Sequence, residues 1–168
     1  MSITVAPPVR SRSRVHWTVE TLERGGGVAR IERDTRYTRL RVSDPGDPNA
    51  TEAWLSDDGT VTVRSHCSPP ALLVSTGGAR LIPATPDTED SAELGPGDVL
   101  LLCSSGVLDS VPTGLGEILG WSPRRVANHE PRALLEHLMT GAERGATAVV
   151  RCTGVQTLGP GGHQEEDV

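Results

Sequence analysis

The chain has few aromatic residues and no lysine. Its 168 residues include no Phe, one Tyr and three Trp, and all 16 basic residues are Arg. A core without Phe must be built from Leu, Val, Ile and Ala. The hydrophobic fraction of 36% and the charged fraction of 23% are ordinary for a globular protein. The composition therefore excludes neither an enzyme nor a binding module.

The net charge, the apolar segments and the cysteines further limit the class of protein. The net charge of −6 provides no general basic face, so we expect no nucleic-acid partner. No apolar run approaches the roughly 20 residues that cross a bilayer, and the first residues lack the regions of a signal peptide, so we expect no membrane association. The three cysteines (Cys67, Cys103 and Cys152) are odd in number and far apart, which favours reduced thiols and a cytoplasmic protein.

The length suits one domain, and we expect it to span residues 15–155. Residues 1–14 are predicted to form a disordered tail, and residues 156–168 a flexible acidic tail. Short segments of alternating or continuous apolar character predict strands at 15–19, 28–31, 37–42, 53–55, 60–64, 71–75, 79–82, 99–103 and 146–152. The segment 83–93 is predicted to be a surface loop.

One main helix is predicted near the C-terminus, over residues 130–144. Five apolar side chains would share one face of it: Leu134, Leu135, Leu138, Met139 and Ala142. Gly145 would end it, and a further short helical turn is predicted at 114–119. The fold class is therefore α+β, a mostly antiparallel sheet with one main C-terminal helix packed on it.

The most informative segment runs from Leu94 to Asp109 and reads LGPGDVLLLCSSGVLD. A turn containing Gly97 and Asp98 leads into a buried strand, and a small-residue turn follows that strand. We expect the Asp98 carboxylate to accept backbone N–H groups and so to have a structural role in this turn.

This segment resembles the motif PGD-x-LLL-Y-T-D-G-x-x-E of bacterial PP2C-type phosphatases of the SpoIIE/RsbU kind. Two further likenesses precede it in the same order as in that family. The segment from His66 to Leu73 is similar to the motif A-G-H-P-P-x-L-L, and a glycine-turn hairpin follows at 74–81. The resemblance implies a fold like the C-terminal half of a PP2C domain.

The residues that carry the family's chemistry differ here. The resemblance places a metal-binding aspartate where this chain has Ser105, before Gly106, and an Asp-Asp pair where it has residues 145–147. Asp109 matches a later acidic position and not the metal ligand. We therefore expect a vestigial site at Ser104, Ser105, Gly106 and Asp109, with no catalytic residue, metal or other cofactor.

The family's first half also differs. Only some 36 residues precede Tyr37, without the two long helices and the Gly-Gly-Asp segment that the resemblance implies. We therefore expect half of the sheet sandwich to be absent and an apolar sheet face to be exposed.

Two other constellations could carry chemistry. His66 and Cys67 could form a soft metal site with Cys103 or Cys152, but the spacing matches no zinc pattern. Ser104, Ser105 and Asp109 could act with His66 as a hydrolase, but the nucleophile-elbow pattern is missing. Neither is favoured over a structural role.

The sequence thus predicts a non-catalytic regulatory module that binds a signalling or transcription-regulatory protein. The resemblance implies a component of a sigma/anti-sigma circuit as partner, and covering the exposed apolar face would make the chain a homodimer. The alternative is a small-molecule-binding domain of the cupin-like or β-roll type, and a third hypothesis is an active phosphatase with unusual ligands.

Overall fold

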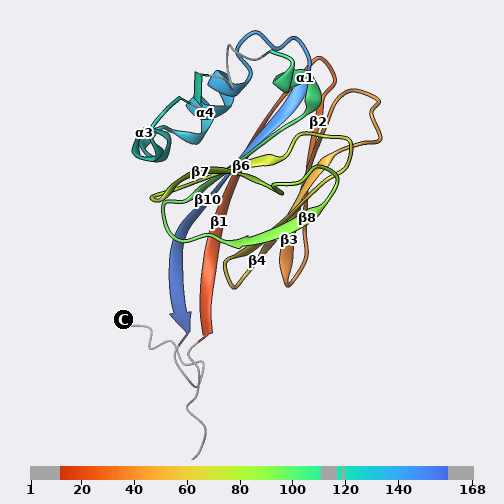
Figure 1. The fold of residues 1–168 in the computed structure, drawn as a ribbon. Coiled ribbons are helices and arrows are strands. Elements are labelled where there is room, and N and C mark those ends of the chain that lie inside the picture. Colours follow the sequence, from red (N-terminus) through yellow and green to blue (C-terminus); the bar gives the residue numbers. More distant parts are fainter. Residues whose placement is uncertain (1–11, 111–116, 119, 159–168) are drawn as a thin grey trace, which may run out of the picture.

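Two five-stranded antiparallel sheets pack face to face and form a sandwich (Figure 1). The computed structural model describes residues 12–110, 117–118 and 120–158. The first sheet has the order β1 (Arg12–Arg24), β10 (Gly145–Leu158), β9 (Val99–Cys103), β6 (Ala71–Ser75) and β7 (Gly78–Ile82). The second has the order β2 (Val28–Arg33), β3 (Tyr37–Ser43), β4 (Thr51–Ser56), β5 (Thr60–Ser65) and β8 (Glu89–Glu93).

The main core lies between the two sheets. Alternate residues of β3, β4 and β5 point into it, because period two places every second side chain on one face. They are Leu40, Val42, Ala53, Leu55, Val61 and Val63. From the first sheet, Leu100, Leu102 and Val150 meet them. Each such fully buried Leu or Val stabilises the fold by about 1.5–3 kcal/mol.

A second core lies between the first sheet and two helices, α3 (Pro123–Asn128) and α4 (Pro131–Leu138). Both helices cover the outer face of the first sheet (Figure 1). The α4 residues Leu134, Leu135 and Leu138 pack there against the sheet side chains Leu101 and Val149, among others. Strands β6 and β9 are therefore buried on both faces, as their continuous apolar runs predicted. None of the described helices is long and apolar enough to cross a membrane.

The outer face of the second sheet is charged. Arg39 of β3 contacts Glu52 of β4 at 3.1 Å and Glu32 of β2 at 3.8 Å, and its guanidinium lies 5.7 Å from the ring centroid of Trp54. No described helix covers this face. The expectation of a missing half-sandwich with an exposed apolar face is thus wrong, because both sheets are present and the face without helices carries polar side chains.

Three element predictions need correction. The helix expected over 130–144 is shorter, since α4 ends at Leu138, Gly141 has φ +80° and Gly145 begins β10. The segment expected to be a loop at 83–93 contains β8, which pairs with β5. Helices α1 (Ser105–Leu108) and α3 were not predicted, although Ser122 followed by Pro123 is a typical helix start and the Ser122 hydroxyl accepts the N–H of Arg125.

The predicted tails and the predicted turn at 114–119 fall largely outside the described residues. Strand β1 already begins at Arg12, where it pairs with Leu158 of β10. Residues 12–14 and 156–158, which were expected to be parts of the tails, therefore belong to β1 and β10, because they pair with one another. Of the turn at 114–119, Glu117 and Ile118 are described, and both are helical.

Candidate functional site

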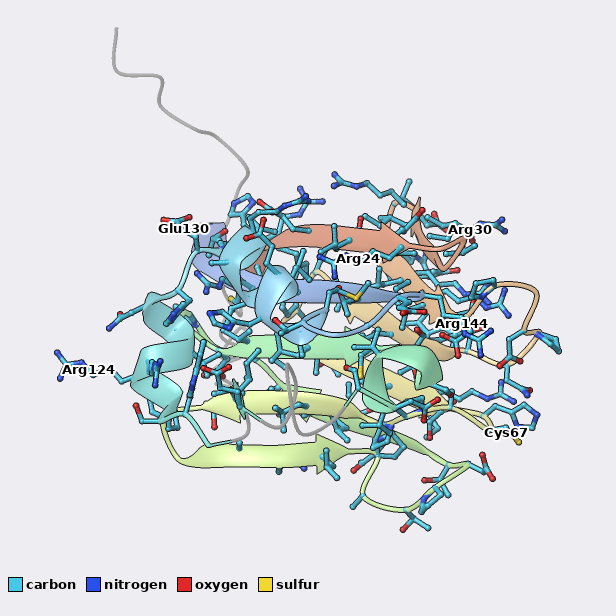
Figure 2. The ribbon with its side chains drawn as sticks, turned by 90° about the horizontal axis from the view of Figure 1, so that it is seen from above. Arg24, Arg30, Cys67, Arg124, Glu130 and Arg144 are labelled. Carbon is cyan, nitrogen blue, oxygen red and sulfur yellow. The ribbon has the colours of Figure 1, made fainter. Side chains whose placement is uncertain are left out.

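The residues of the predicted vestigial site lie at one end of the sandwich, which we call the α1 end. Strand β9 ends there, α1 begins, and β10 starts. The loops 25–27, 44–50, 66–70 and 83–88 are at the same end, because each connects strands that end or begin there. Figure 2 shows Arg30, Cys67 and Arg144 on this side, together with α1.

Ser104 directly follows β9 and is hydrogen-bonded to the start of β10. Its buried hydroxyl oxygen accepts the N–H of Ala146 at 2.9 Å, and its own N–H donates to the carbonyl of Ala146 at 2.9 Å. The hydroxyl is thereby used in holding two strands together. No such bond joins Ser104 to His66 among the described residues, so the hydrolase constellation is not assembled.

Gly145 stands where the resemblance placed an Asp-Asp pair, and the structure leaves no room for a side chain. A Cβ at this position would lie 2.7 Å from the Ser104 hydroxyl and 2.8 Å from a methyl group of Val107. The φ of +132° is in addition one that other residues rarely adopt. A carboxylate therefore cannot be carried at this position without rearranging β10.

One carboxylate is hydrogen-bonded to the first turn of α1, and sequence reasoning missed it. Asp44 follows β3, and its two carboxylate oxygens accept the N–H of Gly106 at 3.0 and 2.8 Å. A Cβ on Gly106 would come within 2.9 Å of Asp44 Oδ1 and 2.8 Å of the Arg144 carbonyl oxygen, so glycine is required here. In the sequence, Asp44 is part of an Asp-Pro-Gly turn, which contains no signal that it would reach α1.

Cys103 is the last residue of β9 and is buried beside this carboxylate. Burial, and to a smaller extent the negative charge of Asp44, raises the pKa of the Cys103 thiol from 9.0 to about 12. The thiol is consequently protonated at neutral pH and is neither a nucleophile nor a ready metal ligand.

The other predicted residues lie apart from this centre. Asp109 is exposed at the C-terminal end of α1. Asp98 lies at the opposite end of β9, about 20 Å from Ser104 at roughly 3.3 Å per residue. Its carboxylate accepts the N–H of Gly95 at 2.9 Å, and Gly97 in the same turn has φ +87°.

The soft metal site that His66 and Cys67 could have formed with Cys103 or Cys152 is not assembled, in agreement with the preference for a structural role. Cys103 packs in the core beneath the helices, whereas Cys152 packs in the core between the sheets, on the other face of the first sheet. His66 and Cys67 are exposed in the loop after β5. These thiols therefore cannot share one ion.

The residues at the α1 end do not fit a pair of Mg²⁺ or Mn²⁺ ions. Such a centre needs several converging carboxylates. Among the described residues around α1, Asp44 supplies the one carboxylate bonded to the turn, and both of its oxygens hold Gly106. Ser105, Gly145 and Ala146 add no charge.

Neither a protein-family model nor a curated protein sequence matches the chain. Several solved structures, however, are similar to the chain in fold. The PP2C phosphatase domain of SpoIIE from Bacillus subtilis, with a fragment of its regulatory domain, is similar at a TM-score of 0.64 and 11% identity, over 85% of this chain and 63% of that chain. The RsbU and RsbW domains of a Mycobacterium tuberculosis protein give a TM-score of 0.59 and 13% identity, over 85% of this chain and 61% of that chain. The M. tuberculosis serine/threonine phosphatase PstP gives 0.53 and 12%, over 83% of this chain and 99% of that chain.

The chain therefore has the fold of PP2C-type phosphatase domains, as the resemblance predicted. It spans less than two thirds of the length of the first two structures. The cupin-like or β-roll fold of the alternative is wrong, because α3 and α4 lie between β9 and β10 and the two sheets match the phosphatase fold, whereas small-molecule binding stays a prediction. At these identities the likeness concerns the fold alone.

Proposed function

We propose that the chain is a non-catalytic regulatory module that uses a PP2C-type scaffold to bind a protein partner. One observation carries the proposal. At the turn after β9, Ser105 stands before Gly106, and the nearby carboxylate of Asp44 is held by the Gly106 N–H. Little negative charge is thus available there for hard metal ions, because both oxygens of Asp44 already accept a hydrogen bond within the fold.

The α1 end is the surface we propose for the partner. Arg30 and Arg144 are exposed at this end (Figure 2), and neither has an ion-pair partner among the residues that the structure describes. Free guanidinium groups are suited to carboxylate or phosphate groups on a partner, which they bind through two parallel hydrogen bonds. Regulation would come from occupancy of this surface, without turnover.

The partner class is the one that the sequence resemblance implies, and two structural neighbours support the choice. One neighbour joins an RsbU and an RsbW domain in one chain, and another is described as a cell fate determinant. A component of a cytoplasmic sigma/anti-sigma circuit is therefore the partner that we propose to test first.

The catalytic half of the proposal is tested with a phosphatase assay. The purified chain is incubated with a phosphopeptide and with p-nitrophenyl phosphate in the presence of Mn²⁺ or Mg²⁺. We expect hydrolysis at the rate of the protein-free blank, both for the wild type and for Asp44→Asn. Metal-dependent turnover that is lost in Asp44→Asn would contradict the proposal and revive the active-phosphatase hypothesis.

The binding half is tested with the sigma, anti-sigma and anti-sigma-antagonist proteins of the source organism, the antagonists both phosphorylated and unphosphorylated. We expect a 1:1 complex with one of them, weakened by Arg144→Glu. The matched control is Arg124→Glu on α3, an exposed arginine on the side of the molecule opposite the α1 end (Figure 2). The proposal fails if none of these proteins binds, and equal loss in both variants contradicts the proposed surface.

The homodimer remains a prediction, but a different apolar surface now supports it. The apolar face that it was meant to cover is buried, but Leu81 of β7 and Leu108 of α1 are 51% and 40% exposed. Both line an apolar cavity of about 180 Å³ beside α4. Light scattering of the purified chain, with Leu81→Ser as the variant, decides whether this surface joins two copies.

A further inference from the structure

Three metal-ligating side chains meet on the surface of the α1 end, and neither Asp44 nor Gly106 is among them. They are His66 and Cys67 from the loop between β5 and β6, and Asp87 from the loop between β7 and β8. Their ligand atoms (one imidazole nitrogen, the thiol sulfur and one carboxylate oxygen) lie within 4.8 Å of one another. Twenty residues separate Cys67 from Asp87, so the arrangement comes from the fold and not from a local motif.

The spacing of the three atoms suits a single ion. In tetrahedral zinc sites the bonds are about 2.3 Å to sulfur and about 2.0–2.2 Å to nitrogen or oxygen. Two ligand atoms on one such ion are then about 3.5 Å apart by tetrahedral geometry. The three atoms need to approach by about 1.3 Å at most, which small rotations of exposed side chains provide.

Hydrogen bonds hold both loops in place. Asp87 Oδ1 accepts the N–H of Cys67 at 2.6 Å and so ties one ligand loop to the other. The Ser68 hydroxyl accepts the N–H of His66 at 3.1 Å and donates to the Ala50 carbonyl at 2.7 Å. The loop of Asp87 is fixed by the carbonyl of Thr88, which accepts the N–H of Ser65 at 3.3 Å.

The backbone at two of the three residues is strained. Cys67 has φ +46° and Asp87 has φ +58°, and they are the non-glycine residues with positive φ among the described part of the chain. Residues other than glycine rarely adopt this region, and those that do cluster at ligand clamps and active sites.

We propose that His66, Cys67 and Asp87 bind a divalent transition metal ion, with Zn²⁺ as the best fit. A mixed set of thiolate, imidazole and carboxylate donors favours Zn²⁺ over Mg²⁺, Mn²⁺ or Ca²⁺, which prefer oxygen ligands. The site is therefore chemically distinct from a phosphatase metal centre and does not depend on the proposed function. All three side chains are exposed, so a fourth position remains open to water or to another donor.

The experiment is a titration of the chelator-treated, reduced full chain with Co²⁺, followed by displacement with Zn²⁺. We expect one ion per chain and an absorption band from the cobalt–thiolate bond, which Zn²⁺ abolishes. Cys67→Ser should remove the band. His66→Gln and Asp87→Asn should weaken binding by about 10-fold or more, the scale of losing even a supporting interaction at a metal site.

The variants are chosen so that the loops stay intact. In Asp87→Asn the amide oxygen can still accept the N–H of Cys67, and Asp90→Asn on β8 is the matched control, expected to bind like the wild type. Thermal melting of each metal-free variant confirms that it is folded. A band that persists in Cys67→Ser, equal losses in Asp87→Asn and Asp90→Asn, no band at all, or one ion per two chains would each overturn the site.

Discussion

The carboxylate of Asp44 holds the backbone N–H of Gly106 with both of its oxygens, at 3.0 and 2.8 Å, across 62 residues of sequence. This contact joins the end of β3 in the second sheet to the first turn after β9 in the first sheet. It connects the two sheets beside Ser105, where the resemblance placed a metal-binding aspartate. An internal hydrogen bond thus occupies the carboxylate of Asp44.

Removing this carboxylate should destabilise the protein. A hydrogen bond to a charged group contributes about 1.5–3 kcal/mol, so we expect Asp44→Ala to lower the free energy of unfolding by about that amount. Denaturant unfolding measures it. Asp109→Ala, at the exposed end of α1, should change stability by less than about 0.5 kcal/mol, as surface substitutions do. Equal effects of the two substitutions would contradict the structural role of Asp44.

Gly145 should not tolerate a side chain. We expect Gly145→Ala to cost about 2 kcal/mol or more, since the new Cβ would overlap Ser104 and Val107 in addition to straining the backbone. Gly46→Ala is the matched control, because Gly46 has φ +68° and a Cβ added there would meet no atom within 4 Å, so it should lose only the strain of about 1 kcal/mol. A smaller loss for Gly145→Ala than for Gly46→Ala would show that the close packing does not exist in solution.

Stability should fall in alkaline solution because of Cys103. Its pKa is raised from 9.0 to about 12 in the folded state, so below pH 9 the thiol is protonated in both states and has no effect. Between pH 9 and 12 the unfolded chain releases the proton and the folded chain retains it, which favours unfolding by up to about 1.4 kcal/mol per pH unit.

The measurement is the free energy of unfolding at pH 8 and pH 10.5 for the wild type and Cys103→Ala, under reducing conditions. Cys103→Ala should be less stable than the wild type at pH 8, because it leaves a cavity, and should lose less stability on going to pH 10.5. Parallel curves for the two proteins would contradict the buried, protonated thiol. Cys67→Ala, at an exposed position, should follow the wild type.

Asp98 should contribute to stability through its turn. Its carboxylate accepts the N–H of Gly95 at 2.9 Å, so Asp98→Ala should cost about 1 kcal/mol. Thermal and denaturant melting measure this loss, and Asp98→Asn should recover part of it because its amide oxygen can still accept the bond. An Asp98→Ala variant that melts like the wild type would remove the structural role.

Much of the fold could be predicted from local pattern. The continuous apolar runs at 71–75 and 99–103 predicted strands buried on both faces, and the structure places them between two cores. The spacing of Leu134, Leu135 and Leu138 predicted the buried face of α4. These signals are strong because burial selects apolar side chains at a period that the local backbone sets.

Strand β8 could not be predicted in this way. Its sequence Glu-Asp-Ser-Ala-Glu is acidic, and it lies at the edge of the second sheet, where Ala92 alone packs partly against the core. An edge strand of this kind is held by its pairing with β5, over Thr60–Arg64, and not by its own apolar pattern. The same pairing adds the edge strand of the second sheet, whereas sequence reasoning expected half of the sandwich to be absent.

The sequence by itself determined most of the strands and the buried face of α4, and it has Ser105 where the resemblance placed a metal-binding aspartate. Only the tertiary structure decided that Asp44 reaches Gly106 and that Asp87 meets His66 and Cys67. The physical reason is that side-chain periodicity is a local property of the backbone, whereas these contacts depend on strand order, register and the packing of two sheets. Those arise from the summed burial of the whole chain.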